Sequence, residues 1–208
     1  MADLNRLSDL RRLARLRAPT RRLPFLDGDV ALSPFQEGRS YLLSAYSKVG
    51  KTEVMIRVVQ QWGEEEWGAR QVLWVSEESQ SIWEDRALKL PDFPDNILIA
   101  HAMGIKLEQL GELIEEVEHQ VLVIDTVKML QIKDENDVGE VMAKLTPLLA
   151  KQQREGNIAI LLHHTRKQGG SHGMSASGSH AFSAATDAVL EIQRGKPDNR
   201  RKLLGGGG

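Results

Sequence analysis

Short apolar runs alternate with amphipathic stretches along this chain, and this alternation limits the possible folds more than any other feature. Six apolar runs are typical of β-strands, at residues 40–44, 72–76, 97–101, 121–125, 158–163 and 188–192. Four stretches between them have the apolar spacing of helices, at residues 51–62, 81–90, 106–119 and 138–155. Near-continuous apolar runs such as VLVID are expected in strands that are buried on both faces. The sequence therefore predicts an α/β fold, with a mainly parallel sheet sandwiched by helices and ligands at the carboxyl ends of its strands.

The size and composition fit a globular domain with a substantial core. The chain has 208 residues, of which 41% are hydrophobic and 27% charged. It contains no cysteine, which excludes disulfides, a thiolate nucleophile and cysteine-ligated zinc. Its longest apolar runs, such as 121–124 and 158–162, are too short to cross a membrane, and arginines interrupt the leucines near the N-terminus. We therefore expect a cytoplasmic protein without a membrane partner.

Basic charge is concentrated at the start of the chain. Residues 1–22 carry seven arginines against two aspartates, a balance of +5 that leaves −7 for the rest of a chain with net charge −2. Leucines at every third position, at 4, 7, 10, 13 and 16, predict a helix that ends near Arg17. Because this spacing winds the leucines round the helix, the arm either packs on a neighbouring protomer or folds back on its own domain. Its arginines suit an acidic neighbour, a nucleic acid or plain solvent.

Residues 45–52, AYSKVGKT, fit the pattern of a phosphate-binding loop, with Ala45 in the place of the usual first glycine. The loop follows an expected strand and opens an expected helix, which is the context that this motif requires. Gly50 lets the backbone approach phosphates, and Lys51 places a positive charge on their oxygens beside the backbone N–H groups. Thr52 offers a hydroxyl to Mg²⁺. The candidate nucleotide-binding residues are Ala45, Tyr46, Ser47, Lys48, Val49, Gly50, Lys51, Thr52 and Glu53.

A phosphate loop of this kind works with an acid at the end of a buried strand. Asp125 directly follows the apolar residues 121–124. A carboxylate at this point can hold Mg²⁺ through the water around the ion. Thr52 and Asp125 are therefore the expected magnesium ligands.

A pair of acids, Glu77 and Glu78, follows the expected strand at residues 72–76. A carboxylate at the carboxyl end of that strand can orient and deprotonate an attacking water molecule, as a general base must. The alternative is that both glutamates only place negative charge at the N-terminus of the next helix, where the helix dipole stabilises them.

In this order, the motifs resemble those of RecA-like ATPases, and specifically the branch that contains RepA-type hexameric helicases and DnaB replicative helicases. The resemblance runs from about residue 26 to residue 194. It rests on SKVGKT (47–52), VLWVSEES (72–79), VLVIDTV (121–127), ILLHHTRK (160–167) and GSHAFSAATDAVLEI (178–192). It implies a RecA-like P-loop fold, hydrolysis of ATP with Mg²⁺, a homo-oligomeric ring such as a hexamer, and movement on single-stranded DNA.

The resemblance also implies roles for residues around the nucleotide. Glu78, the second acid of the pair, matches the catalytic glutamate, and Lys51 is the catalytic lysine of the loop. Arg86, downstream in the same motif, is expected to contact the nucleotide. His164, or less favourably His163, matches the polar residue that senses the γ-phosphate and couples it to the loop that follows.

Two further segments are expected to act between subunits or on DNA. Arg166 and Lys167 match the region that reaches the neighbouring subunit's nucleotide as a trans-acting finger, and the alternative is an exposed basic pair. The glycine- and serine-rich loop 168–179 matches the loop that touches single-stranded nucleic acid in the channel of related rings. Its N–H and hydroxyl groups suit a phosphate backbone read without sequence preference.

Two other functions fit the same fold. One is a non-motor ATP-dependent switch in recombination, defence or regulation. The other is a nucleotide-binding scaffold without hydrolysis, against which the retained Lys51, Thr52, Glu78, Asp125 and His164 argue.

Three segments make up the expected domain organisation. A basic helical arm covers residues 1–23, the ATPase domain residues 24–204, and a glycine tail residues 205–208. The sequence after residue 194 looks like the start of a hairpin whose return strands are absent. The C-terminal strands of the domain are therefore expected to be truncated.

Overall fold

A single β-sheet organises the structure, a computed structural model that describes residues 20–26, 28–46, 48–90, 95–165, 179–194 and 201–207. Seven strands of the described residues join in the order β3-β2-β4-β5-β1-β6-β7. Every pair of neighbours is parallel except β6 and β7, which are antiparallel. The strands are β1 (Ser40–Tyr46), β2 (Val72–Ser76), β3 (Ile97–His101), β4 (Val121–Asp125), β5 (Ile158–Thr165), β6 (Ala188–Arg194) and β7 (Arg201–Gly207).

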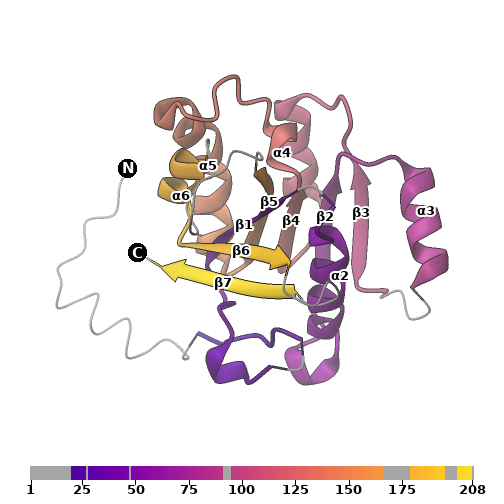
Figure 1. Cartoon of the computed structure of the whole chain (residues 1–208). Helices are drawn as coiled ribbons and strands as arrows, with labels where there is room; N and C mark the ends of the chain where they lie inside the picture. The colour runs from indigo at the N-terminus through magenta and orange to yellow at the C-terminus, as the bar shows by residue number, and fades with distance from the viewer. Residues whose placement is uncertain are drawn as a thin grey trace.

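Helices cover both faces of this sheet (Figure 1). On one face, α2 contributes Met55 and Trp62 to a core cluster that also contains Trp83 of α3. On the other face, α4 and α5 pack on the sheet together with Phe182 of α6. The helices are α2 (Lys51–Trp62), α3 (Gln80–Lys89), α4 (Leu107–Glu116), α5 (Val138–Glu155) and α6 (Ser179–Ala185), with short 3-10 turns η1 (Val30–Leu32), η2 (Glu65–Trp67) and η3 (Val127–Leu130).

The longest helix, α5, illustrates how local sequence sets these elements. The Asp137 side chain accepts a hydrogen bond from the Glu140 amide and caps the first turn. Val141, Leu145 and Leu149 recur every four residues and are buried against the sheet. The helix ends at Gly156, whose φ of 77° is the left-handed conformation that favours glycine. The predicted boundaries of this helix, 138–155, are confirmed.

The strand order brings the predicted site together. Ser76 at the end of β2 lies beside Asp125 at the end of β4, and Asp125 lies beside Leu162 of β5. On the other side of β5, His164 pairs with Ala45 of β1. The carboxyl ends of four strands therefore meet at one edge, above which the phosphate loop leads into α2.

The C-terminal part of the fold corrects two expectations. Strand β7 pairs along β6, from Arg201 opposite Arg194 to Gly207 opposite Ala188. The predicted absence of a return strand is therefore wrong, and three glycines of the predicted tail belong to a strand. Glycine carries little strand propensity, so residues 205–207 were not expected to continue the hairpin that begins after residue 194. Helix α6, in a serine- and alanine-rich stretch, was not predicted either.

Residues 1–19, which hold the predicted arm helix, lie outside the described residues, so that prediction stays open. Only the end of the arm is described: Leu23 is fully buried in the core on the α2 side of the sheet. None of the helices among the described residues is long and apolar enough to cross a membrane.

Candidate nucleotide-binding site

The phosphate loop joins β1 to α2, as its sequence predicts. Gly50 precedes the first helical residue with a φ of 91°, a conformation that side chains with a Cβ rarely adopt. Its carbonyl accepts the amide of Val54 and starts the helix, while the Val49 amide closes a turn onto Tyr46. The positive end of the α2 dipole therefore faces the loop, which suits an anion. Ser47 lies outside the described residues.

Lys51 is the central charge of the site and is only 4% exposed. Burial lowers its pKa to about 8, although the charges of Asp125, Glu77 and Glu53 act in the opposite direction. Its Nζ lies 2.9 Å from Nδ1 of His164. Burial, and then the lysine charge, lower the pKa of His164 to about 4, so the imidazole is neutral and accepts a hydrogen bond from the lysine.

The side chain of His163, the less favoured sensor, lies in a different environment. Its ring is 2% exposed and lies against Phe182 of α6, with centroids 5.3 Å apart. Its Nε2 is 3.5 Å from a carboxylate oxygen of Glu135, in the loop before α5. Lys51 donates its hydrogen bond to His164, the preferred sensor, and interacts with His163 only through its charge among the contacts described.

Thr52 and Asp125 form the pair expected to bind magnesium. The Thr52 hydroxyl donates a hydrogen bond of 2.9 Å to Oδ2 of Asp125. Burial raises the pKa of Asp125 to about 6, although the Thr52 hydrogen bond and the Lys51 charge oppose the shift. A hydroxyl and a carboxylate are hard oxygen ligands of the kind that Mg²⁺ prefers. The described residues contain no group of three acidic or histidine side chains able to hold a metal, so the nucleotide and water would supply the other ligands.

Glu78 is held by Arg86, which reaches it from α3. Both carboxylate oxygens of Glu78 accept bonds from the guanidinium, and Nη2 of Arg86 also lies 3.3 Å from Glu53 of α2. The guanidinium stacks over the Trp83 ring at 4.9 Å. Burial would lower the pKa of Arg86, but hydrogen bonding and charge from Glu78 outweigh it and raise the pKa. The negative charge of Glu78 is therefore neutralised within the site.

Glu77 has different partners. Its amide donates to the carbonyl of Asp125 at 2.8 Å, and its Oε2 accepts the hydroxyl of Thr126 at 3.1 Å. The amide of Glu78, by contrast, is fixed by the Ser76 hydroxyl at 3.0 Å. The Glu77 side chain thus contacts the residue after β4 and the Glu78 side chain contacts α3, in addition to the helix-dipole role that was left as an alternative.

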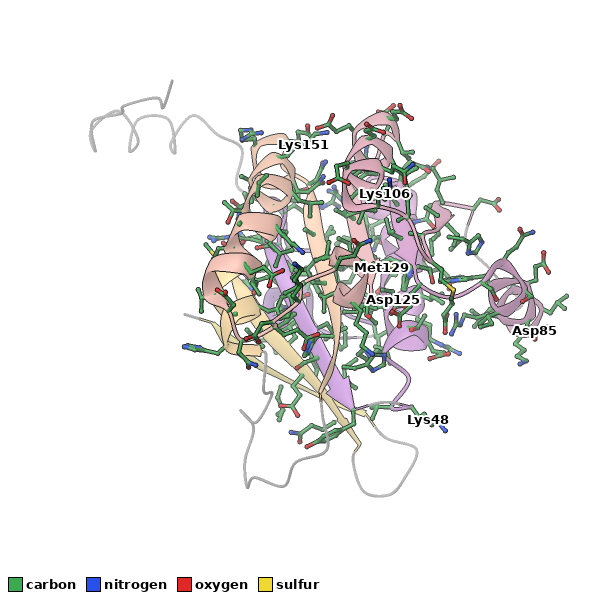
Figure 2. All side chains as sticks on the ribbon, turned by 90° about the horizontal axis from the view of Figure 1, so that it is seen from above. Lys48, Asp85, Lys106, Asp125, Met129 and Lys151 are labelled. Carbon is green, nitrogen blue, oxygen red and sulfur yellow. The ribbon has the colours of Figure 1, made fainter. Side chains whose placement is uncertain are left out.

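Three residues of this site were not predicted. Ser76 accepts bonds from the Glu78 amide and the Trp83 indole, and Thr126 holds Glu77. Lys128, in the turn after β4, contributes positive charge that lowers the pKa of both Lys51 and His164. The only feature of the sequence that could have indicated a place in the site was their position within three residues of a strand end. Figure 2 labels Asp125 at the end of β4 in this region.

The remaining predicted residues divide into two groups. Ala45 and Val49 are buried beneath the loop, while Tyr46 and Lys48 reach its surface. Arg166, Lys167 and the loop 168–178 lie outside the described residues, so the trans-acting finger and the DNA loop stay predictions.

Comparisons with known proteins agree with this fold. A family model described as an AAA domain matches residues 31–170. A KaiC-like protein from the hyperthermophilic archaeon Pyrococcus horikoshii OT3 has a similar crystal structure, with a TM-score of 0.64 and 18% identity over 91% of this chain and 89% of that one. The RadB recombinase has a TM-score of 0.61 and 13% identity over 83% and 82%. No curated protein matches the sequence. At these identities the structural likeness shows the fold alone, a RecA-like P-loop fold, as predicted.

Proposed function

We propose that this chain, which belongs to the AAA domain family of P-loop ATPases, binds and hydrolyses Mg-ATP and uses that cycle to move on single-stranded DNA as a RepA- or DnaB-like helicase or translocase. One observation carries the ATPase part. At the N-terminus of α2, the Thr52 hydroxyl bonds Asp125 of β4, and the charge of the buried Lys51 lies close enough to interact with Asp125, so a cation and a pair of hard oxygen ligands face the place where a magnesium nucleotide would bind.

Nucleotide binding would replace contacts that these residues now make with one another. Lys51 would turn from the His164 imidazole to the phosphate oxygens, and His164 would then be placed to sense the γ-phosphate. Thr52 and Asp125 would hold Mg²⁺, which neutralises charge on the β- and γ-phosphate oxygens. The phosphates bring negative charge next to Lys51, which favours its protonated form.

Glu78 is the proposed general base. In the structure the Arg86 guanidinium occupies both carboxylate oxygens of Glu78, so it would have to leave before either oxygen could accept a proton from water. Guanidinium groups bind phosphates with the same fork of donors that they offer to carboxylates. Arg86 would therefore move from Glu78 to the nucleotide, consistent with its predicted role as a nucleotide ligand, and release Glu78 to activate water.

Glu77 is the alternative base, and a specific observation favours it. In the structure its side chain accepts a hydrogen bond from the Thr126 hydroxyl, whereas Arg86 pairs with Glu78. After Asp125, Glu77 is also the charge that raises the pKa of Lys51 most. Substituting the two acids one at a time separates these assignments.

The DNA-dependent part is supported by the path of β5. This strand carries His164 beside Lys51 and continues towards the predicted DNA loop at 168–179. A change in the contacts of His164 when the γ-phosphate leaves would act on the residues that follow it. Arg166 and Lys167 would serve a neighbouring site in a homo-oligomeric ring.

The ATPase rate with and without single-stranded DNA, measured together with particle mass by light scattering, tests the proposal. Stimulation that weakens steeply as salt rises is the expected result, because phosphate contacts release counterions. Absence of stimulation at low salt in an assembled particle would favour the second candidate, an ATP-dependent switch that acts on a partner.

A further inference from the structure

Two neighbouring residues near the end of β5 face opposite sides of the sheet. Side chains along a strand alternate between its two faces. His164 lies on the α2 face together with Leu162, and its ring contacts Lys51 there. His163 lies on the other face together with Leu161, where α4, α5 and α6 cover the sheet. One peptide bond therefore connects the nucleotide side of the sheet with the α6 side.

On that second face, His163 is enclosed by two segments that are distant from it in sequence. Its ring is 2% exposed and lies against the fully buried ring of Phe182 in α6. Its Nε2 faces Oε2 of Glu135, in the segment between η3 and α5, at 3.5 Å. Burial lowers the pKa of His163, although the Glu135 charge opposes the shift, so the ring is neutral and its Nε2 proton points to the carboxylate.

The other ring nitrogen of His163 is buried without a partner. Nδ1 accepts no hydrogen bond from any of the described residues. A buried acceptor that lacks a donor destabilises the arrangement that contains it. A shift of the ring that brings a donor to Nδ1 would therefore gain a hydrogen bond, so the present position of the ring is not the only favourable one.

The backbone that carries this ring is held on one side only. Pairing between β4 and β5 ends at Leu162, whereas pairing between β1 and β5 continues to Thr165. Among the described strands, residues 163–165 thus form a ladder with β1 alone. A segment with fewer hydrogen bonds to its neighbours moves at a lower cost in free energy than one in the middle of the sheet. The end of β5 is therefore the part of the strand that a change in the contacts of His164 can shift.

We propose that His163 is a positioning residue that transmits the nucleotide state to α6. When His164 exchanges Lys51 for the γ-phosphate, the end of β5 shifts, and the His163 ring moves α6 through its contact with Phe182. Glu135 orients the ring during this movement. Helix α6 begins at Ser179, where the predicted DNA loop ends, so this contact connects the far end of that loop to the nucleotide. The inference deepens the proposed function and rests on its nucleotide site.

An environment-sensitive dye on α6 tests this movement, because the chain has no other cysteine to label. Ala184→Cys places the dye at an exposed residue of α6. Its emission should differ between chains saturated with Mg-ADP and with the magnesium complex of a non-hydrolysable ATP analogue. Glu135→Ala or Phe182→Leu should reduce this difference at least about threefold. Glu135→Gln should preserve it, because the amide oxygen still accepts the Nε2 proton, and a dye at Glu112→Cys, exposed on α4, should show no difference.

Further measurements on the same chains separate transmission from a purely structural role. Glu135 is 28% exposed, so its substitution should leave the melting temperature nearly unchanged and calorimetric Mg-ATP affinity within about twofold of wild type. In a His163→Leu chain, Glu135→Ala should cause no further loss of the dye response, because Glu135 acts through His163. Independent, additive losses would overturn the proposal. So would intact nucleotide binding with identical dye emission in both nucleotide states of the chain that carries only Ala184→Cys.

Binding of an oligothymidine strand distinguishes this inference from the DNA-dependent part of the proposed function. The dissociation constant of the unsubstituted chain should differ between the two nucleotides, and Glu135→Ala should bring the ratio close to one. If no chain binds the strand but the dye response persists and depends on Glu135, the DNA motor is wrong and the transmission through His163 is supported. If the unsubstituted chain fails to bind Mg-ATP, the proposed function fails and the transmission fails with it.

Discussion

Lys51 shows how one residue of the site balances burial against charge. Its ammonium is almost fully buried, which destabilises the charged form, and the nearby acids and the His164 imidazole recover part of that cost. Phosphate oxygens would offer a stronger partner than a neutral imidazole, because both groups of the new pair are charged. Lys51 is therefore positioned to bind an anion such as a phosphate group.

Replacing Lys51 with alanine should greatly weaken the binding of Mg-ATP. Loss of a charged hydrogen bond costs about 3 kcal/mol, equivalent to roughly a hundredfold in affinity. Calorimetric titration with Mg-ATP measures the change, and Lys89→Ala, at the exposed end of α3, is the matched control. Unchanged affinity in Lys51→Ala would remove the basis for the nucleotide site.

Substituting Glu77 and Glu78 one at a time separates nucleotide binding from ATP hydrolysis. Glu78→Gln should keep Mg-ATP affinity and slow steady-state hydrolysis roughly a hundredfold or more, because an amide cannot accept the proton of the attacking water. Glu77→Gln tests the alternative base in the same assay. If hydrolysis survives in Glu78→Gln and is lost in Glu77→Gln, Glu77 is the base and Glu78 serves only to hold Arg86.

The roles of these residues were only partly predictable from their positions. The phosphate-loop pattern and the strand ends identified Lys51, Thr52 and Asp125, because local sequence determines where each strand stops. The ion pair between Arg86 and Glu78 depends on how α3 packs against β2, and Thr126 depends on the neighbouring strand. Such contacts arise between elements, and a single sequence carries no pattern for them.

At the scale of elements, strands that coincide with short apolar runs were predicted well. The bounds of β2, β3 and β4 agree with the apolar runs that predict them. Helix α4 ends at Glu116, three residues before its predicted end, because Val117 is extended and His119 turns back to bond its carbonyl. Helix α6 and strand β7 were missed because serine, alanine and glycine carry little periodic apolar signal.

Asp187 links three elements and gives a test of stability. It precedes β6 and accepts bonds from the Ser40 amide at 2.8 Å, the Ser40 hydroxyl at 2.6 Å and Gln153 of α5 at 2.8 Å. Burial would raise its pKa, but these hydrogen bonds and that of Arg39 outweigh burial and lower the pKa. Asp187 therefore fixes the start of β6 to β1 and to α5.

Asp187→Asn should lower the free energy of unfolding by about 1–3 kcal/mol at pH 7, measured by chemical denaturation. Because the folded pKa is depressed, the stabilising charge is fully present above the unfolded value of about 3.9 and is lost as pH falls through the folded pKa. The difference between wild type and variant should therefore shrink in acid below about pH 4. A difference that stays constant down to pH 2 would show that the carboxylate charge has no part in this stability.

At the scale of the whole molecule, charge is divided between a basic arm and an acidic body. The described end of the arm segment contacts the body, where Arg22 bonds the Ser33 carbonyl at 2.9 Å and Leu23 is buried. Removing residues 1–19 should leave these contacts and nucleotide binding intact while reducing particle mass in light scattering. Normal assembly with reduced affinity for single-stranded DNA would instead identify the arm as a DNA contact.

A ring that shares its sites between subunits should also allow complementation. Subunits with Arg166→Ala and Lys167→Ala keep Glu78 but lack the proposed finger, whereas Glu78→Gln subunits keep the finger but lack the base. In a mixed particle, a site that takes its base from the first subunit and its finger from the second is complete, so some ATPase activity should return. With random mixing in equal amounts about one quarter of the interfaces would have this arrangement, which sets the expected ceiling near a quarter of the wild-type rate. Activity no higher than the average of the two unmixed variants would mean that each subunit hydrolyses ATP without its neighbour's basic pair.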